Sequence, residues 1–323
     1  MSLLRPLIAL AVVVAACWFG MTFVEHHEVE NPNEQAFGLL YAHLMPAHLV
    51  VPRQAEADGH QEHGAGPQHV LELTVPGLPA VFDQVPNEEG VQLVASNLQL
   101  FQMVAVLLVL ITFSGVVKHI RYGGGDWLSR HMAGFAMWVR DEMVYPVMGP
   151  ERGRKFLPWF LCVFFFILFM NLLGLVPGSA TATANVFVTG ALAVITLSSM
   201  ILSGMFVQGP IAFWLNLVPH VHWSLWWLMA IVELIGLLVK PFALMVRLFA
   251  NMTGGHMVVL SFMGLIFFFA GKDHSALGWA ISPVAVGFAV FIMIIEIFVA
   301  MLQAYIFTQL SILFVSASVH PEH

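Results

Sequence analysis

Long apolar runs separated by short polar stretches make up most of the chain from residue 97 onward. About 20 apolar residues in a helix span the ~30 Å hydrocarbon core of a bilayer, since each residue adds about 1.5 Å. The pattern therefore predicts an all-α polytopic membrane protein with about five transmembrane helices. The expected helical spans are 97–117, 156–176, 186–207, 223–270 and 277–317.

The last two runs are too long to cross a bilayer upright. Each exceeds 40 residues and would be about 60 Å long or more if fully helical, roughly twice the hydrocarbon thickness. We therefore expect each run to be strongly tilted, bent or split, with Pro241, Gly254-Gly255 and Pro283 as candidate bends. The polar turn Lys272-Asp273-His274 joins the two runs into a hairpin.

Composition agrees with the pattern. The 323 residues are 59% hydrophobic and only 10% charged, with a mean hydropathy of +0.85, whereas a soluble domain has about 25% charged residues. The net charge of -7 argues against nucleic-acid binding. Cys17 and Cys162 both lie in apolar segments and support neither a disulfide framework nor a metal site.

The first 24 residues form a separate apolar segment. Residues 1–24 carry Arg5 and then an apolar run, which is typical of a signal peptide or an uncleaved N-terminal anchor. The string Val14-Ala15-Ala16-Cys17 also resembles a bacterial lipoprotein cleavage box. All three interpretations place the segment that follows outside the cytoplasm.

Residues 25–96 are predicted to be an external polar extension, rich in His and Pro, with short or no regular structure. The histidines around His60-Gln61-Glu62-His63 could bind a metal weakly, but the spacing lacks the HExxH form of a zinc protease helix. We therefore favour solvated loop histidines and expect no metal site.

Basic residues define the orientation. The loop 118–155 holds seven of the twelve Lys and Arg residues, so the positive-inside rule makes this loop cytoplasmic. Its middle, residues 131–147, mixes apolar and charged residues and reads as an amphipathic helix lying on the membrane. Five crossings after an external extension leave the C-terminal tail 318–323 in the cytoplasm.

Ionisable residues interrupt the weakly charged run between residues 221 and 271. Lys240, Arg247 and His256 would lie within lipid, where an ionised group at mid-bilayer costs roughly 2.5–3.5 kcal/mol on insertion scales. Arg247 lies deep in this run, with mostly apolar residues on both sides, so we do not expect its side chain to reach water by snorkelling. Such a group indicates a partner, a water-filled cavity or an ion path.

Helical geometry divides these polar residues between two faces. Glu233, Lys240 and Arg247 are seven residues apart and form one stripe, which Asn251 continues one turn later. His256 follows Arg247 by nine residues and points to the opposite face. The helix would therefore present a guanidinium to one neighbour and an imidazole to another.

The last run adds Glu296 and Gln303, which share one face. If His256 and Glu296 meet across the hairpin, the pair can take up and release protons near neutral pH. Arg247 stays protonated in a protein and can serve as a fixed positive barrier. These parts suit proton conduction in two segments, although the shuttling carboxylate would have to come from another subunit.

Four motifs together resemble subunit a of the rotary F-type ATP synthase. RLFANMTGGH at Arg247–His256 is similar to the family's RLFxNxxxGH/E motif, and LQAYIF at Leu302–Phe307 to its C-terminal LQAxIF motif. NLLGLVP at Asn171–Pro177 and RGRKFLP at Arg152–Pro158 resemble two further family elements. The four motifs occur in the same order as in the family, and the resemblance covers roughly residues 97–317.

The resemblance implies a proton-conducting stator subunit of the Fo sector, with two half-channels and an essential arginine that drives c-ring rotation coupled to ATP synthesis or hydrolysis. The last two helices would form a hairpin against the ring of c subunits. Arg247 would face the c-subunit carboxylates, and His256 and Glu296 would belong to the outer half-channel. The remaining proton-path candidates are Asn251, Gln303 facing Arg247, Glu233 near the cytoplasmic half-channel, and Lys240 on the same inward side.

The same resemblance implies partners. These are the c-ring, the peripheral-stalk b subunits, the rest of the F-type ATP synthase and the lipid bilayer, with H+ or Na+ as the transported ion. The sequence contains no GxxxxGK[ST] loop, so we expect a non-catalytic subunit without nucleotide site or cofactor. Two departures are Ala243, where the family often has Ser, and the long extension 25–96.

Two other classes remain open from the residues alone. A secondary ion transporter would need internal repeats and an acid able to cycle alone, and we find no repeat. An intramembrane metalloenzyme would need several histidines at depth, where the spans contain only His256. The lack of an Arg-rich transit peptide and the lipoprotein-like box favour a bacterial inner membrane.

Overall fold

Helices dominate the computed structural model, which describes residues 4–23, 84–87, 90–93, 97–123, 126–176, 181–217, 223–269 and 275–319. Five of its helices are long and apolar enough to cross a membrane, which confirms the expected fold class. The elements are α1 (Leu4–Phe23), β1 (Gln84–Asn87), β2 (Gly90–Leu93), α3 (Asn97–Tyr122), α4 (Trp127–Trp138), a π-helix (Val139–Val144), α5 (Tyr145–Gly174), a 3-10 turn (Ala182–Ala184), α6 (Val186–Gln208), α7 (Pro210–Asn216), α8 (Trp223–Phe269) and α9 (Ser275–Val319).

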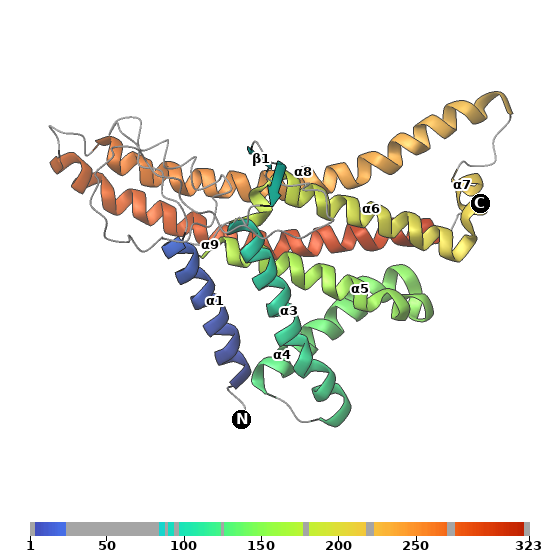
Figure 1. Cartoon of the computed structure of the whole chain (residues 1–323), viewed down its shortest axis with the longest axis horizontal. Helices are drawn as coiled ribbons and strands as arrows, with labels where there is room; N and C mark the ends of the chain where they lie inside the picture. The colour runs from blue at the N-terminus through green and yellow to red at the C-terminus, as the bar shows by residue number, and fades with distance from the viewer. Residues whose placement is uncertain are drawn as a thin grey trace.

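The two longest helices lie side by side as an antiparallel pair (Figure 1). Neither is split: α8 continues through Pro241 and α9 through Pro283. At 47 and 45 residues they are each about 70 Å long. In Figure 1 both run across the molecule, at a steep angle to α1 and α3, and one end of α8 diverges from α9. Helices of this length fit a bilayer only when strongly tilted.

The chain folds back at a glycine near the start of α5. The expected amphipathic stretch 131–147 is helical, but it changes from α-helix to π-helix at Val139. The chain then turns at Gly149, whose φ of 73° lies in the left-handed region that favours glycine. Pro150 starts the helix that follows, a position where its missing N–H is no loss. The long apolar part of α5 therefore begins after this turn.

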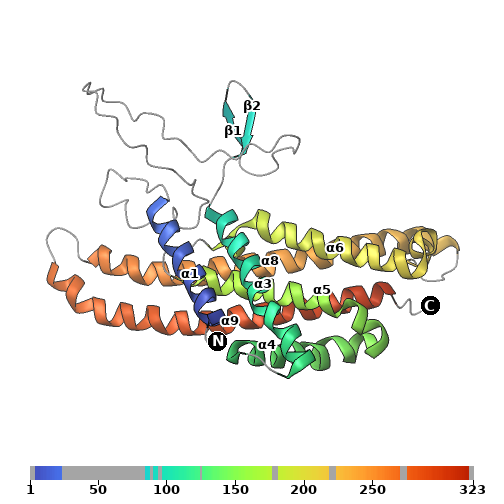
Figure 2. The same ribbon diagram turned by 60° about the horizontal axis from the view of Figure 1, so that its bottom comes forward.

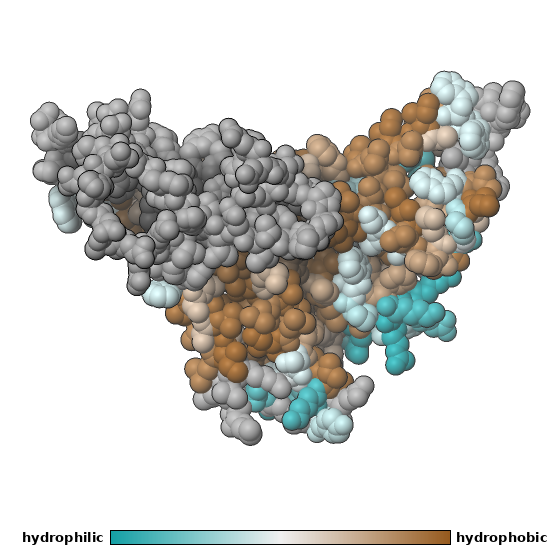
Figure 3. All heavy atoms as spheres, in the orientation of Figure 1, coloured by the Kyte–Doolittle hydropathy of each residue, from teal (hydrophilic) through white to brown (hydrophobic). Residues whose placement is uncertain are grey.

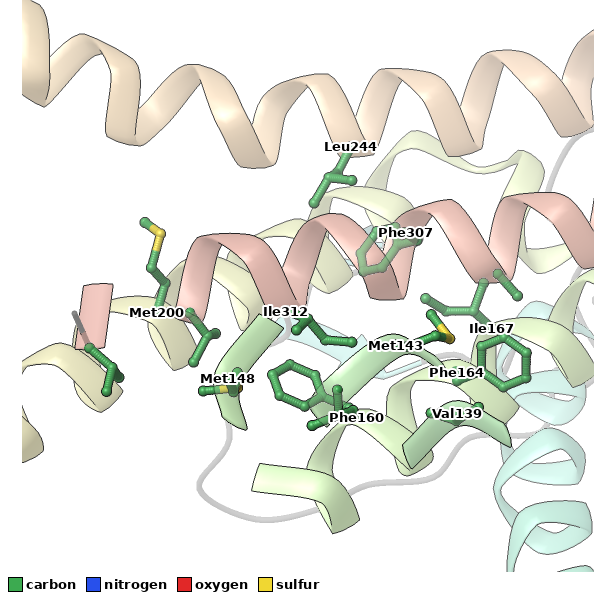
Figure 4. Packing of buried hydrophobic residues seen from close by; sticks show 14 of the residues in the cluster. Val139, Met143, Met148, Phe160, Phe164, Ile167, Met200, Leu244, Phe307 and Ile312 are labelled. Carbon is green, nitrogen blue, oxygen red and sulfur yellow. The ribbon is translucent and has the colours of Figure 1, made fainter. Parts of the chain in front are cut away.

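The main hydrophobic core joins α5, α6, α8 and α9 (Figure 4). Phe160 and Ile167 of α5, Leu244 of α8 and Phe307 of α9 are fully or almost fully buried there. The π-helix contributes Val139 and Met143 to the same core. This packing holds the α8–α9 hairpin against the α5–α6 pair.

The N-terminal helix packs on α3. Ala16 and Cys17 are buried in a second cluster with Phe101, Val104 and Ala105 of α3. A small residue such as Ala105, with no exposed surface, lets two helices approach closely in lipid. The structure thus gives α1 a specific packing partner within the bundle.

The β1–β2 hairpin and the main hydrophilic patch lie toward opposite ends of α3. The β1–β2 hairpin, the described part of the 25–96 extension, lies at the end of α3 opposite the α3–α4 turn (Figure 2). In Figure 3, hydrophilic residues gather near that turn and where α5 begins, while hydrophobic residues cover much of the surface between. This arrangement is typical of a multi-pass membrane protein.

Candidate functional site

Three polar side chains from distant parts of the chain meet near the end of α5. Thr181 precedes the 3-10 turn, His256 is on α8 and Glu296 is on α9. The Nε2 atom of His256 lies 2.8 Å from Thr181 Oγ1 and 3.8 Å from Glu296 Oε1. Glu296 is 5% exposed, so this carboxyl is almost enclosed by the fold.

The hydroxyl of Thr181 determines which imidazole nitrogen carries the proton. Thr181 Oγ1 donates its single hydrogen to the carbonyl oxygen of Gly174 at 3.1 Å, because a carbonyl can only accept. The short contact to His256 must then be one in which Nε2–H donates to Thr181. A neutral His256 is therefore the Nε2–H tautomer, with Nδ1 as the acceptor.

Two glycines make the close approach possible. A Cβ atom at Gly255 would overlap the carboxyl group of Glu296, and one at Gly174 would lie 2.8 Å from Thr181 Cγ2. Neither position tolerates a larger side chain without moving the polar group beside it. The two glycines thus hold Glu296 and Thr181 near His256.

A second polar contact crosses the hairpin one to two turns away. Asn251 donates from Nδ2 to Gln303 Oε1 at 3.4 Å, and Gln303 is buried. Asn171 of α5 is fully buried and donates to the carbonyl oxygen of Ala300 at 3.3 Å. These contacts attach the middle of α9 to both α8 and α5.

Contacts between α8 and α9 form an orderly ladder. Lys240 lies 5.8 Å from the ring centroid of Phe314, and the rings of Phe262 and Phe288 stack with their centroids 5.4 Å apart. Residues further along α8 therefore contact residues earlier in α9, as expected for an antiparallel pair.

Glu233 of α8 is half-buried, with no hydrogen bond or ion pair to any residue that the structure describes.

Arg247 stands apart from this network. It is exposed on the surface of α8, and within the described ranges no hydrogen bond or ion pair reaches its guanidinium. Gln303, which the resemblance places opposite Arg247, is hydrogen-bonded to Asn251 instead. His256 is on the inner side of the helix, as the nine-residue spacing predicts.

Small residues flank the guanidinium on its exposed stripe. Ala243, Ala250 and Gly254 are all exposed, and their spacing of four, three and seven residues from Arg247 puts them on one helix face. A face of small residues lets another helix approach the backbone closely in a membrane. Ala243, a departure from the family at the sequence level, belongs to this face.

No group of three or more His, Cys, Asp or Glu side chains within metal-binding reach occurs among the described residues. The histidines at 60 and 63 lie outside the described residues. The His256–Glu296 pair by itself provides two ligands, fewer than a structural or catalytic zinc site requires.

Sequence reasoning named His256 and Glu296 but missed Thr181. This residue lies in an uncharged link between two spans, and nothing in its local pattern separates it from the neighbouring Thr183. In the structure Thr181 bonds to the carbonyl oxygen of Gly174, the one glycine of the motif NLLGLVP, and packs closely against it. Only the three-dimensional contact identifies it.

The arrangement can pass a proton through the imidazole ring. A proton that binds to Nδ1 of His256 makes the imidazolium, which can release the Nε2 proton to a Glu296 carboxylate after a small shortening of the 3.8 Å gap. The net result is one proton moved to Glu296 and a ring left in the Nδ1–H tautomer. The ring returns to its starting tautomer, and to the bond with Thr181, only when Nδ1 releases its proton and Nε2 takes up another.

Comparison with known proteins gives the family context. Residues 99–316 match the family model described as "ATP synthase A chain". Among curated relatives, "ATP synthase subunit a" of Chloroherpeton thalassium is 50% identical over 68% of this chain and 65% of its own length. "ATP synthase subunit a 2" of Prosthecochloris aestuarii is 48% identical over 88% of this chain and 90% of its own.

A third relative, "ATP synthase subunit a" of Myxococcus xanthus, is 44% identical over 58% of this chain. The matched regions thus span less than two thirds of some relatives, 65% for the Chloroherpeton protein and 59% for the Myxococcus protein. The family match itself covers the helices that carry Arg247, His256 and Glu296.

We expect Thr181→Val to shift the tautomer of His256, because valine fills the same space but cannot accept the Nε2–H bond. Nitrogen NMR of the protein with 15N-labelled histidine measures the two tautomers, and His256→Gln identifies which signals belong to this ring. Thr181→Ser keeps the hydroxyl and should keep the Nε2–H form. An unchanged His256 signal in the valine variant would show that Thr181 does not fix the tautomer.

Proposed function

Because this chain belongs to the ATP synthase A chain family, we propose that it is the proton-conducting stator subunit of an F-type ATP synthase. In this proposal the chain holds two half-channels that end on either side of Arg247. A ring of c subunits carries protons from one half-channel to the other, and its rotation couples the flux to ATP synthesis or hydrolysis. The chain itself binds no nucleotide.

The observation that carries the proposal is the position of Arg247. It lies one residue past the midpoint of α8, a helix of 47 residues, and is exposed among apolar residues such as Val246. An ionised guanidinium at membrane depth is too costly to leave in hydrocarbon. A carboxylate on a neighbouring subunit, approaching over Ala243, Ala250 and Gly254, would compensate the charge.

The outer half-channel is assigned to the contacts around His256. The imidazole can relay a proton to Glu296, and both groups are on the side of α8 away from the exposed stripe. Asn251 and Gln303 lie between this pair and Arg247 along the hairpin, and so extend the polar path toward the ring. Glu233 and Lys240 lie on the other side of Arg247 along α8 and are proposed for the cytoplasmic half-channel.

The remaining assignments follow from the same proposal. The partners are the c-ring, the b subunits of the peripheral stalk and the rest of the complex. Since the positive-inside rule favours a cytoplasmic loop 118–155, the proposed location is a bacterial inner membrane with the C-terminus in the cytoplasm. The transported ion is H+ or Na+, with the choice made by the c-ring site, which is on another chain.

We expect the exposed stripe of α8 to contact the ring directly. With Cys17 and Cys162 replaced by serine, Ala250→Cys should form a disulfide with a cysteine placed beside the membrane carboxylate of the c subunit. The reason is that Ala250 is exposed one turn from Arg247. Gel mobility of the cross-linked product in native membranes measures the contact.

The matched control is Val194→Cys, which is also exposed but lies on α6, outside the Arg247 stripe. It should give no such product. Equal cross-linking at both positions, or none at Ala250, would remove the support for a ring seated on this stripe.

We expect His256→Ala and Glu296→Ala each to slow proton flux by an order of magnitude or more, because either change breaks the relay. Exchanging the two residues, His256→Glu with Glu296→His, should recover part of the rate, since an imidazole and a carboxyl again face each other. Proton uptake by inverted vesicles measures the flux. A double exchange no faster than the single variants would contradict a direct relay between these positions.

A further inference from the structure

An apolar groove lies between α4, α5 and α9 on the surface of the bundle. Its volume is about 880 Å³, within the roughly 300–1,000 Å³ typical of small-molecule sites. Its lining includes Phe135 and Trp138 of α4, Leu168 and Phe169 of α5, and Met301 of α9. None of these residues belongs to the proposed proton path.

Aromatic contacts give the groove a defined shape. The ring of Trp138 lies 6.4 Å from that of Phe164 and 5.9 Å from that of Tyr305, measured between centroids. Trp138 therefore bridges α4 to both α5 and α9. A groove supported in this way is a preformed feature of the fold.

One end of the groove carries an uncompensated positive charge. Arg130 lines the groove, is exposed, and makes no ion pair with any residue in the described part of the chain. The nearby Arg140 differs, because it is bound to Asp141 at 2.7 Å. Arg130 is thus available to an anion from outside the chain.

The second polar group at this end is His131, whose ring is held in place by Trp127. His131 donates from Nδ1 to the carbonyl oxygen of Trp127 at 3.0 Å, and its ring packs on the Trp127 ring at 4.3 Å. A neutral His131 leaves only an acceptor at Nε2, so Arg130 is the group that holds an anion. Guanidinium binds phosphate oxygens in pairs.

An apolar groove and a basic rim together select an amphipathic anion. A transmembrane helix from a partner would fill the groove with apolar side chains but leave Arg130 facing lipid or water without a counter-charge. A phospholipid supplies acyl chains for the aromatic walls and a phosphate for Arg130. Acidic lipids are also enriched in the leaflet that basic juxtamembrane segments face, and α4 follows the basic end of α3.

We propose that the groove between α4, α5 and α9 is a binding site for one acidic membrane phospholipid, with its phosphate on Arg130 and an acyl chain along Trp138 and Leu168. The lipid would seal the gap between α4 and the α5–α9 pair. The site is independent of the proton path, so its presence does not depend on the proposed function.

The test uses the complete complex in phosphatidylcholine vesicles that contain a small fraction of a photoreactive phosphatidylglycerol with a diazirine in one acyl chain. After illumination, mass spectrometry of peptides locates the label. We expect the α4, α5 and α9 groove peptides to be labelled several-fold more by this probe than by the same probe with a phosphatidylcholine headgroup.

Two variants test the two parts of the site. Arg130→Gln should reduce groove labelling to the level of the phosphatidylcholine probe, whereas Arg154→Gln, an exposed basic residue outside the groove, should leave it unchanged. Gly134→Leu should reduce labelling with both probes, because a Cβ at Gly134 meets open space and a leucine there fills the groove.

Three outcomes would overturn the proposal. Equal labelling by the two probes would mean that the groove accepts any lipid. Unchanged labelling in Arg130→Gln would show that Arg130 does not bind the lipid phosphate. Absence of label in the groove, with label present on the exposed face of α6, would mean that a partner protein covers it.

Discussion

The energetic cost of an unpaired charge in hydrocarbon is the constraint on which this structure depends. Arg247 is near the centre of a helix of 47 residues and has no partner within the described chain. Arginine cannot relieve the cost by losing its proton. Because this side chain is exposed with small residues beside it, we propose that a neighbouring subunit supplies the opposite charge.

The hairpin of α8 and α9 separates that exposed charge from a closed polar site. His256, Glu296 and Thr181 meet on the inner side, where Gly255 and Gly174 leave room for them. Asn251 and Gln303 connect the two helices between these regions. In the proposed function, the helix pair keeps a titratable relay on one side and a permanent cation on the other, and a third group would carry the proton between them.

The hydrophobic pattern predicted the helices closely, because apolar length alone determines what can span a bilayer. It left open whether the last two runs were split, and the structure shows that both helices continue through their prolines, Pro241 and Pro283. The seven-residue spacing put Arg247, Lys240 and Glu233 on one stripe, and the nine-residue spacing put His256 on the other side. Thr181 could not be found in this way, since its role depends on contacts with Gly174 and His256 from distant segments. The hydrophobic pattern likewise did not reveal the π-helix that begins at Val139.

The most direct measurement of the central claim is ATP-driven proton pumping by inverted vesicles that contain the complex with wild-type chain or with Arg247→Ala, together with a check of complex assembly. The account predicts an assembled complex that no longer pumps, because the ring carboxylates would lose the fixed cation at the boundary between the half-channels. Undiminished pumping by the variant would contradict it and make Arg247 a structural residue.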